Sequence, residues 1–365
     1  MDDGECRVIA SSRDPNREAL AVAIALLASL AIGSALMLVA GKAPGHVWWL
    51  MVERTLFTDA YSLGQVIYKA TALVLTGLSV SVALDAGLFN IGGEGMVIAG
   101  VVACAMTGSA LPASTPALVA VPLCVVVSAA AGALIGGLIG VMRVWRGAHE
   151  VITSIMLNSI VAGIALWLGN ELLFQNGTTT GPPIVAGAEL PQLGFGGSAA
   201  NLSVVLALAA VIALWWLRSR TTWGQALLAV GRDPAAARAT GFSVGRVQIY
   251  AMLAAGAFAG LAATNFVMGH KHAFEEGLGR GVGFLGISAA LLGRMNPFGI
   301  VAAALLLGFL SSGGLAVAQE VPKELTEMLQ GVVVLAVASA GPIARRYGRA
   351  AKDVPADPVR TTGVA

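Results

Sequence analysis

The sequence predicts an all-α, polytopic membrane protein with about ten transmembrane helices, some of them short or broken, and with both termini in the cytoplasm. Of its 365 residues, 57% are hydrophobic and only 12% are charged, about half of the ~25% charged residues that soluble domains carry. Apolar runs near the ~20 residues that a membrane-spanning helix needs recur along the chain. This composition excludes a soluble enzyme, a disordered chain and a nucleic-acid-binding protein.

Ten apolar segments supply the predicted crossings. The first of them, 19–40, is too long for the ~7–15-residue apolar core of a cleavable signal and lacks a basic leader, so we expect a retained span; a removed signal is the alternative. Two segments, 96–111 and 282–293, are short, and broken helices at membrane depth occur only where they line a cavity or pack inside protein. The candidate spans are 19–40, 66–88, 96–111, 117–142, 150–171, 201–217, 247–269, 282–293, 298–318 and 325–341.

Basic residues in the loops predict the orientation. The segment 218–246 contains five arginines and one acid, Asp233, whereas the loop 172–199 contains Glu189 and no lysine or arginine. Because positively charged loops stay in the cytoplasm, the first lies inside and the second outside. The predicted organisation is a cytoplasmic segment at 1–18, a transmembrane domain at 19–341 that includes the cytoplasmic loop 218–246, and a cytoplasmic tail at 342–365.

Glycines at a spacing of four residues predict close helix packing. Gly132, Gly136 and Gly140 lie in one span, and Gly256 and Gly260 lie in a later one. Small residues at this spacing let two helix backbones approach closely. We therefore interpret both sets as packing surfaces.

The run 85–95, with the sequence DAGLFNIGGEG, interrupts an apolar region with two carboxylates, an amide and several glycines. A charge in the bilayer core costs about 2.5–3.5 kcal/mol or more, so these residues need a structural or functional reason. Gly92, Gly93 and Gly95 permit a sharp turn, after which a new helix can begin with Glu94 at its positive end. The run predicts a break between two helices.

Two interpretations of the polar residues at this break stay open. In one, Asn90 and Glu94 line a substrate pathway, together with Asn158 of a later span. In the other, Glu94 caps a helix start, Asn90 forms a turn and Asn158 makes an interhelical hydrogen bond of about 1 kcal/mol. The sequence alone does not separate them.

Signatures of catalysis and metal binding are missing from the sequence. His270 and His272 have no third ligand nearby for a metal site, and the three cysteines predict neither a disulfide framework nor a metal cage. Lys42 follows a glycine but precedes Ala43, so no phosphate-binding loop is present. We expect no enzyme activity, no metal and no cofactor in this chain.

Four runs together resemble the permeases of bacterial ATP-binding-cassette (ABC) importers of the nucleoside and simple-sugar branch, within the branched-chain amino acid and ribose-type family. The resemblance departs from the family pattern at Met96, His149 and Ala235, where Gln, Asn and an acid are usual. The runs are GLFNIGGEG at 87–95, RGAHEVITSIMLN at 146–158, GRDPAAARATG at 231–241 and GFLGISAALLGRMNPFG at 283–299.

The resemblance implies a multi-pass permease of the bacterial plasma (inner) membrane that pairs with a second permease, either a copy of this chain or a different one. A separate ABC ATPase would bind ATP and Mg²⁺, and an external binding protein would deliver the solute. A nucleoside is the favoured solute, with simple sugars and branched-chain amino acids as alternatives. The residues implied in ATPase coupling are Asp233, Ala236, Ala237, Arg238 and Gly241.

Three other classes of protein compete with this interpretation. An ion-coupled secondary transporter with two inverted five-helix halves also predicts matched broken helices, but it has no use for a coupling segment. A membrane-embedded enzyme needs a dyad or metal cluster, which Asp85, Glu94 and Asn158 do not form. A scaffold without a transport role leaves the cost of the intramembrane carboxylates unexplained.

Overall fold

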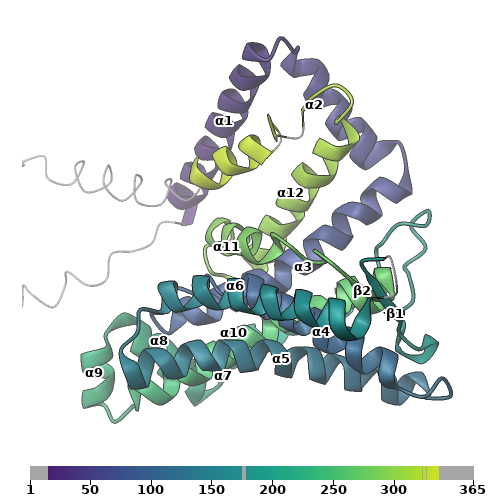
Figure 1. The fold of residues 1–365 in the computed structure, drawn as a ribbon. Helices are drawn as coiled ribbons and strands as arrows, with labels where there is room; N and C mark the ends of the chain where they lie inside the picture. Colours follow the sequence, from purple (N-terminus) through teal and green to yellow (C-terminus); the bar gives the residue numbers. More distant parts are fainter. Residues whose placement is uncertain (1–14, 175–177, 323, 326, 337–365) are drawn as a thin grey trace, which may run out of the picture. The chain divides into compact units, whose positions relative to one another are not determined.

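The computed structural model describes residues 15–174, 178–322, 324–325 and 327–336. Most of the predicted N-terminal segment 1–18 and the whole tail 342–365 lie outside the described residues. The chain divides into two compact units (Figure 1). The first unit consists of Met1–His46 and Glu324–Ala365, and the second consists of Val47–Lys323.

The first unit contains α1 (Pro15–Val39) and a short apolar helix, Glu327–Ala336. These helices coincide with the predicted spans 19–40 and, in part, 325–341. Helix α2 (Pro44–Val52) runs across the boundary between the units and continues into a π-helical turn, η2 (Glu53–Phe57).

Among the described residues, seven helices are long and apolar enough to cross a membrane, or eight if the bent pair Leu27–Val39 and Pro44–Phe57 forms one span. The all-helical class is confirmed, and every predicted span overlaps a helix. Helix α11 (Val282–Leu292) is shorter, as expected for a broken span, so ten crossings stay a prediction. The long helices are α3 (Ala60–Asp85), α4 (Gly93–Ala110), α5 (Ala117–Arg146), α6 (Glu150–Leu168, extended by η3, Gly169–Leu173), α7 (Ser203–Arg220), α10 (Val244–Ala263, extended by η5, Thr264–Lys271) and α12 (Pro297–Ala316).

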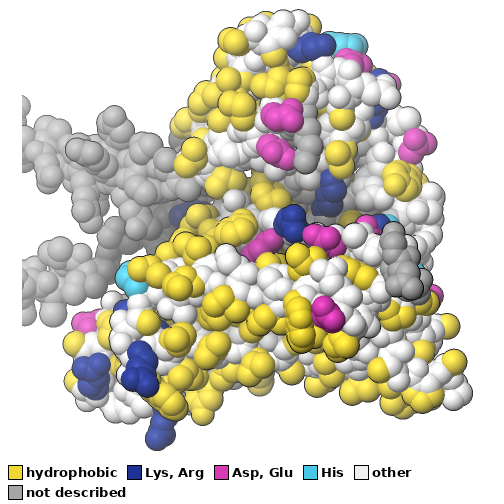
Figure 2. Space-filling view, viewed as in Figure 1, with side chains coloured by type: hydrophobic (Ala, Val, Ile, Leu, Met, Phe, Trp, Pro, Cys, Tyr) yellow, Lys and Arg dark blue, Asp and Glu magenta, His cyan; other side chains and the backbone are white. Residues whose placement is uncertain are grey.

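Burial separates the helices of the second unit into central and outer ones. The apolar window of α3 is 83% buried and that of α10 is 72% buried, whereas the windows of α5 and α6 are only 22% buried. Helices α5 and α6 are also more hydrophobic than α3 and α10, as expected for surfaces that face lipid. Figure 2 shows hydrophobic side chains over much of the visible surface, with one group of basic and acidic side chains near the middle of the view.

The glycines of α5 and α10 pack the two helices backbone against backbone, which confirms the predicted packing role. A Cβ atom on Gly132 would lie 2.2 Å from the carbonyl oxygen of Gly256, and one on Gly260 would lie 2.3 Å from the carbonyl oxygen of Ser128. Backbones in direct contact leave no space for a side chain. This packing holds α10 in the centre, where it continues into the π-helical segment η5.

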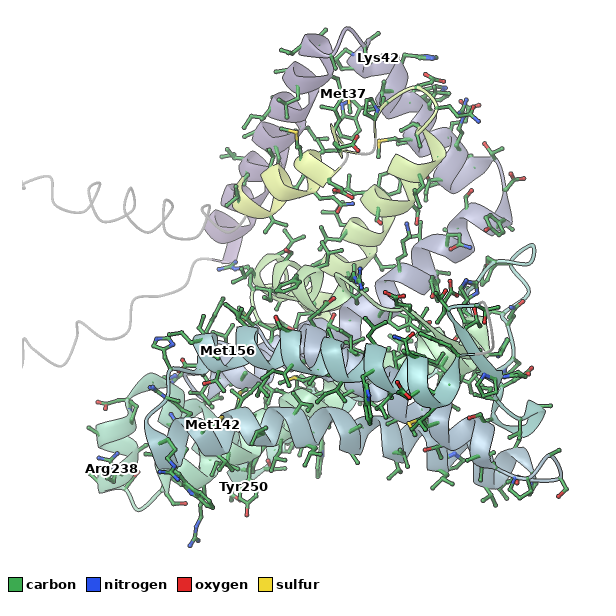
Figure 3. The ribbon with its side chains drawn as sticks, viewed as in Figure 1. Met37, Lys42, Met142, Met156, Arg238 and Tyr250 are labelled. Carbon is green, nitrogen blue, oxygen red and sulfur yellow. The ribbon has the colours of Figure 1, made fainter. Side chains whose placement is uncertain are left out.

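Short elements lie at the two ends of the long helices. Strand β1 (Thr180–Pro183) pairs antiparallel with β2 (Ala273–Glu275), and the 3₁₀ turn η4 (Ala186–Ala188) follows β1. Helices α8 (Thr222–Arg232) and α9 (Pro234–Ala239) lie at the opposite end (Figure 1). Figure 3 labels Arg238 of α9 at the same end as Met142 of α5.

Candidate functional site

The break between α3 and α4 is built around Asn90. Helix α3 ends at Asp85, and Gly87 turns the chain with a φ of 75°. The fully buried Asn90 side chain accepts a hydrogen bond from the Gly92 amide at 2.8 Å and donates one to Ser79 Oγ at 3.2 Å. Asn90 therefore stabilises the turn and ties it back to α3.

The start of α4 lies directly against the start of α11. A Cβ atom on Gly283 would lie 2.2 Å from the backbone nitrogen of Glu94, and one on Gly93 would lie 3.5 Å from the Cα of Gly283. Two helix N-termini that are far apart in the sequence therefore meet backbone to backbone. Both short spans of the sequence analysis take part in this contact.

Glu94 caps α11 rather than its own helix. Glu94 is only 6% exposed, and its carboxylate accepts hydrogen bonds from the amides of Gly281 at 2.5 Å and Gly283 at 3.0 Å. These amides belong to the start of α11, where unpaired N–H groups and the helix dipole favour a negative charge. One acid of the break between α3 and α4, which we call the first break, thus satisfies the backbone at the start of the short helix α11, which forms the second break.

Asn158 of α6 closes the first break from the other side. Its side chain accepts a hydrogen bond from the Gly95 amide at 2.9 Å and donates one to the carbonyl oxygen of Ile91 at 3.0 Å. Glu94 and Asn158 also line a pocket of about 410 Å³, whereas Asn90 does not. The structure therefore brings all three predicted residues to the break and gives each a hydrogen-bonding role there.

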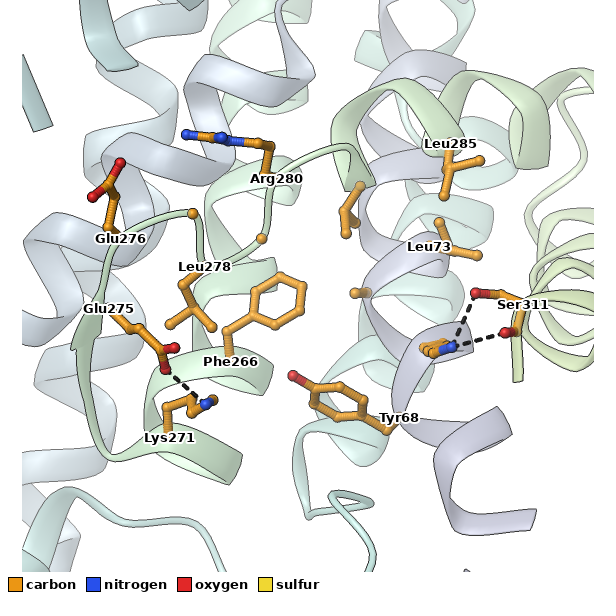
Figure 4. A pocket seen from close by; sticks show the side chains of 15 residues that line it. Tyr68, Leu73, Phe266, Lys271, Glu275, Glu276, Leu278, Arg280, Leu285 and Ser311 are labelled. Atoms are coloured by element: carbon orange, nitrogen blue, oxygen red, sulfur yellow. Dashed lines mark hydrogen bonds and ion pairs between the residues drawn. The ribbon is translucent and has the colours of Figure 1, made fainter. Parts of the chain in front are cut away.

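A second pocket, of about 390 Å³, lies between α3, η5, α11 and α12. The glycine-rich segment 276–281, which we call the strap, separates it from the first pocket, because Leu278 and Arg280 of the strap line both. Figure 4 shows the strap residues Glu276, Leu278 and Arg280 beside the second pocket. Glu94 holds one end of the strap through the amide of Gly281.

Arg218, at the end of α7, joins both breaks at their other ends. Its guanidinium pairs with the Asp85 carboxylate and donates hydrogen bonds of 2.6 Å to Ser81 Oγ and to the carbonyl oxygen of Met295. Met295 lies in the turn between α11 and α12. The sequence analysis treated Arg218 only as a charge that sets orientation, since its partners lie far away in the sequence.

The segment expected to dock an ATPase forms a capped helix. The Asp233 side chain accepts hydrogen bonds from the amides of Ala235 at 2.8 Å and Ala236 at 3.1 Å and so caps α9. Gly241, after the helix, has a φ of 93°. A Cβ atom on Gly231, just before α9, would lie 2.1 Å from the Asp85 carbonyl oxygen, so this segment contacts the first break.

A buried polar cluster beside the second pocket was missed by the sequence analysis. Asn265, in the π-helical segment η5, accepts hydrogen bonds from Asn201 Nδ2 at 3.1 Å and Ser203 Oγ at 2.9 Å, and donates one to the Tyr68 carbonyl oxygen at 3.0 Å. The available signal was an amide inside an apolar run, the same signal that identified Asn158. Such polar groups often hold helices together in membranes.

Candidate metal ligands do not assemble in the part of the chain that the structure describes. No group of three His, Cys, Asp or Glu side chains there could hold an ion. His270 instead packs its ring edge against Tyr68, with ring centroids 5.2 Å apart, and Cys104 and Cys124 are buried free thiols.

The fold and the site define a class of protein: a polytopic helical membrane transporter with a pair of broken helices joined at their N-termini. The chain belongs to the family described as branched-chain amino acid transport system, permease component, which matches residues 62–338. It is thus a multi-pass permease component of a prokaryotic ABC importer, in which a separate subunit hydrolyses ATP.

Three relatives match along nearly their whole length. The chain is 34% identical to the guanosine ABC transporter permease protein NupP of Bacillus subtilis, over 87% of this chain and 92% of the relative. It is 30% identical to the nucleoside permease protein NupB of Lactococcus lactis (88% and 91% covered) and 32% identical to the glucose permease protein TsgB13 of Haloferax volcanii (92% of each). No solved structure matches this chain.

Proposed function

We propose that this permease imports a nucleoside. The observation that carries the proposal is the 34% identity to a guanosine permease over 87% of the chain, which includes all four runs quoted above. A relative named as a glucose permease is similar to nearly the same degree, so simple sugars are the second candidate. Branched-chain amino acids, which appear in the description of the family, come third.

The proposed assembly contains three further components. A second permease, an ABC ATPase that binds ATP and Mg²⁺, and an external binding protein would complete the importer. The named guanosine permeases NupP and NupQ of one organism, both similar to this chain, favour a pair of different permeases. We also propose ten crossings with both termini in the cytoplasm, as the loop charges predict.

The ATPase would dock on α9 and the residues around it. Asp233 fixes the helix, Ala236 and Arg238 lie on its exposed surface, and Gly241 supplies the left-handed turn that ends the segment. Ala237 is buried and would seat the helix on the permease. Closure of the ATPase would then move the permease as a rigid body, and the contact of Gly231 with the Asp85 backbone would carry that movement to the first break.

Uptake measurements test the proposal directly. Cells with and without this chain, each containing the other subunits, receive radiolabelled adenosine, guanosine, ribose, glucose or leucine in separate assays. Loss of nucleoside uptake alone in the cells that lack the chain is the expected result. Loss of only ribose, glucose or leucine uptake would instead assign the permease to that solute.

A docking variant tests the coupling segment independently of the solute. Gly241→Asp should leave the permease in the membrane but abolish solute-stimulated ATP hydrolysis in the assembled importer, because a residue with a side chain is strained at a φ of 93°. Undiminished stimulation would remove this segment from the docking model.

A further inference from the structure

The second pocket, between α3 and η5, has the chemistry of a binding site, although none of the residues singled out in the sequence lines it. Its apolar lining includes the rings of Tyr68 and Phe266 and the side chains of Leu73 and Leu285. The Tyr68 and Phe266 rings meet edge to face, with centroids 6.0 Å apart and planes at 86°. Figure 4 shows the two aromatic side chains next to each other among the residues that line the pocket.

The rest of the lining carries charges of both signs. Lys271 and Glu275 form an ion pair at 2.7 Å, and Glu276 and Arg280 of the strap lie nearby. Lys69, on the far side of the pocket, donates hydrogen bonds of 3.0 Å to the hydroxyl and the carbonyl oxygen of Ser311. These groups offer several donors and acceptors with little excess charge, which suits a neutral ligand rich in hydroxyl groups.

The apolar and the charged parts of the pocket lining together match one ligand class. A nucleoside has a flat base that stacks on aromatic rings, and a neutral ribose whose hydroxyl groups bond to carboxylates and ammonium groups. The cavity volume of about 390 Å³ lies within the range of small-molecule sites, and such sites combine mostly apolar walls with a few placed polar groups.

We propose that this pocket binds the nucleoside in transit, with the base against Tyr68 and Phe266 and the ribose toward the Lys271–Glu275 pair. This inference rests on the proposed function. The solute would then pass the strap to the pocket lined by Glu94 and Asn158, since Leu278 and Arg280 belong to both pockets. The π-helical segment η5 positions Phe266 and Lys271 in the lining of the pocket, and such segments occur frequently at functional sites.

Substitutions of the two aromatic residues test the site in the assembled importer. Tyr68→Leu and Phe266→Leu should each lower the rate of adenosine uptake at a limiting adenosine concentration by on the order of tenfold, the scale of one lost base–aromatic stack. Tyr68→Phe keeps the ring and should retain most of the uptake. Tyr61→Leu, at an exposed tyrosine of the same helix, is the matched control and should transport like the parent chain.

A labelling experiment covers the case in which a leucine variant does not fold. The assembled importer with the unaltered chain is irradiated with 8-azidoadenosine, and labelled peptides are identified by mass spectrometry. Labels within 66–73 or 264–282 that excess adenosine removes, and excess ribose does not, would support the site.

The outcomes separate this inference from the proposed function. Adenosine uptake that is unchanged in both leucine variants, or protected labels only elsewhere in the chain, would overturn the pocket while leaving nucleoside import intact. A parent chain that transports ribose or glucose and no nucleoside would overturn the proposed solute and the nucleoside assignment of the pocket together.

Discussion

The two breaks in the transmembrane helices contact each other through different kinds of groups: the first contributes charged side chains, and the second contributes backbone amides and a carbonyl oxygen. The break between α3 and α4 brings two carboxylates, Asp85 and Glu94, whereas α11 and the turn after it use backbone groups to bind Glu94 and Arg218, the partner of Asp85. Glu94 accepts from the amides of Gly281 and Gly283, and Arg218, paired with Asp85, donates to the carbonyl oxygen of Met295.

This difference explains how the protein tolerates the free-energy cost of two acids within an apolar region. Each carboxylate is compensated, one by an arginine and the other by a helix N-terminus, and each compensation ties the first break to the second. A charge in a membrane domain can therefore join two backbones without touching a solute. Three substitutions test this division of roles, and their expected effects decrease in the order given.

Arg218→Met should have the largest effect. The variant leaves the buried Asp85 carboxylate without its partner, and loss of one member of a buried ion pair costs about 3–5 kcal/mol. We expect a large fall in the thermal unfolding temperature of the purified permease. Arg220→Met, at an exposed arginine two residues later, serves as the control and should change little.

A second substitution sharpens the test of this ion pair. Adding Asp85→Asn to Arg218→Met removes the uncompensated charge and should recover part of the lost stability. If the double variant is no more stable than Arg218→Met alone, the loss comes from the contacts of Arg218 with Ser81 and Met295 and not from the unpaired acid.

Gly283→Ala should have the next largest effect. The added Cβ would lie 2.2 Å from the Glu94 backbone nitrogen, so the two helix starts must separate, at a cost of about 3 kcal/mol. Thermal unfolding and the yield of folded permease measure this cost. Gly163→Ala, on α6 with nothing within 4 Å of the added atom, should behave like the parent chain, and equal stability of both variants would contradict the backbone contact.

The sequence predicted the break itself but not its partner. Apolar length located the helices, because crossing a bilayer sets a minimum run of hydrophobic residues, and polar residues inside such runs revealed Asn90, Glu94 and Asn158. The groups that bind Glu94 are backbone amides, which every residue except proline carries, so nothing in the sequence distinguishes Gly281 and Gly283 as its partners.

The second pocket escaped prediction for a related reason. Tyr68 and Lys69 lie in α3, whose apolar window is 83% buried inside the protein, so polar residues are tolerated there without interrupting the helix. From the sequence, Phe266 cannot be distinguished from the other apolar residues of its span. Their common location depends on the packing of α3 against η5, which periodicity within one helix does not encode.

Glu94→Gln should have the smallest of the three effects and separates the two interpretations of this residue. The variant keeps one acceptor oxygen, but its amide group then faces a backbone N–H that it cannot bond, so a loss of about 2 kcal/mol is expected. Glu171→Gln, at an exposed acid, is the control. Thermal unfolding and nucleoside uptake are measured on the same preparations.

The two readouts distinguish a cap from a pathway residue. If Glu94 acts only through the start of α11, uptake per folded molecule should stay near that of the parent chain while the unfolding temperature falls. Normal thermal stability with lost uptake would instead place the carboxylate in the solute pathway, which its position in the pocket shared with Asn158 and Arg280 allows. A fall in both would mean that the contact between the two breaks itself moves during transport, because the same two hydrogen bonds would then control folding and the strap.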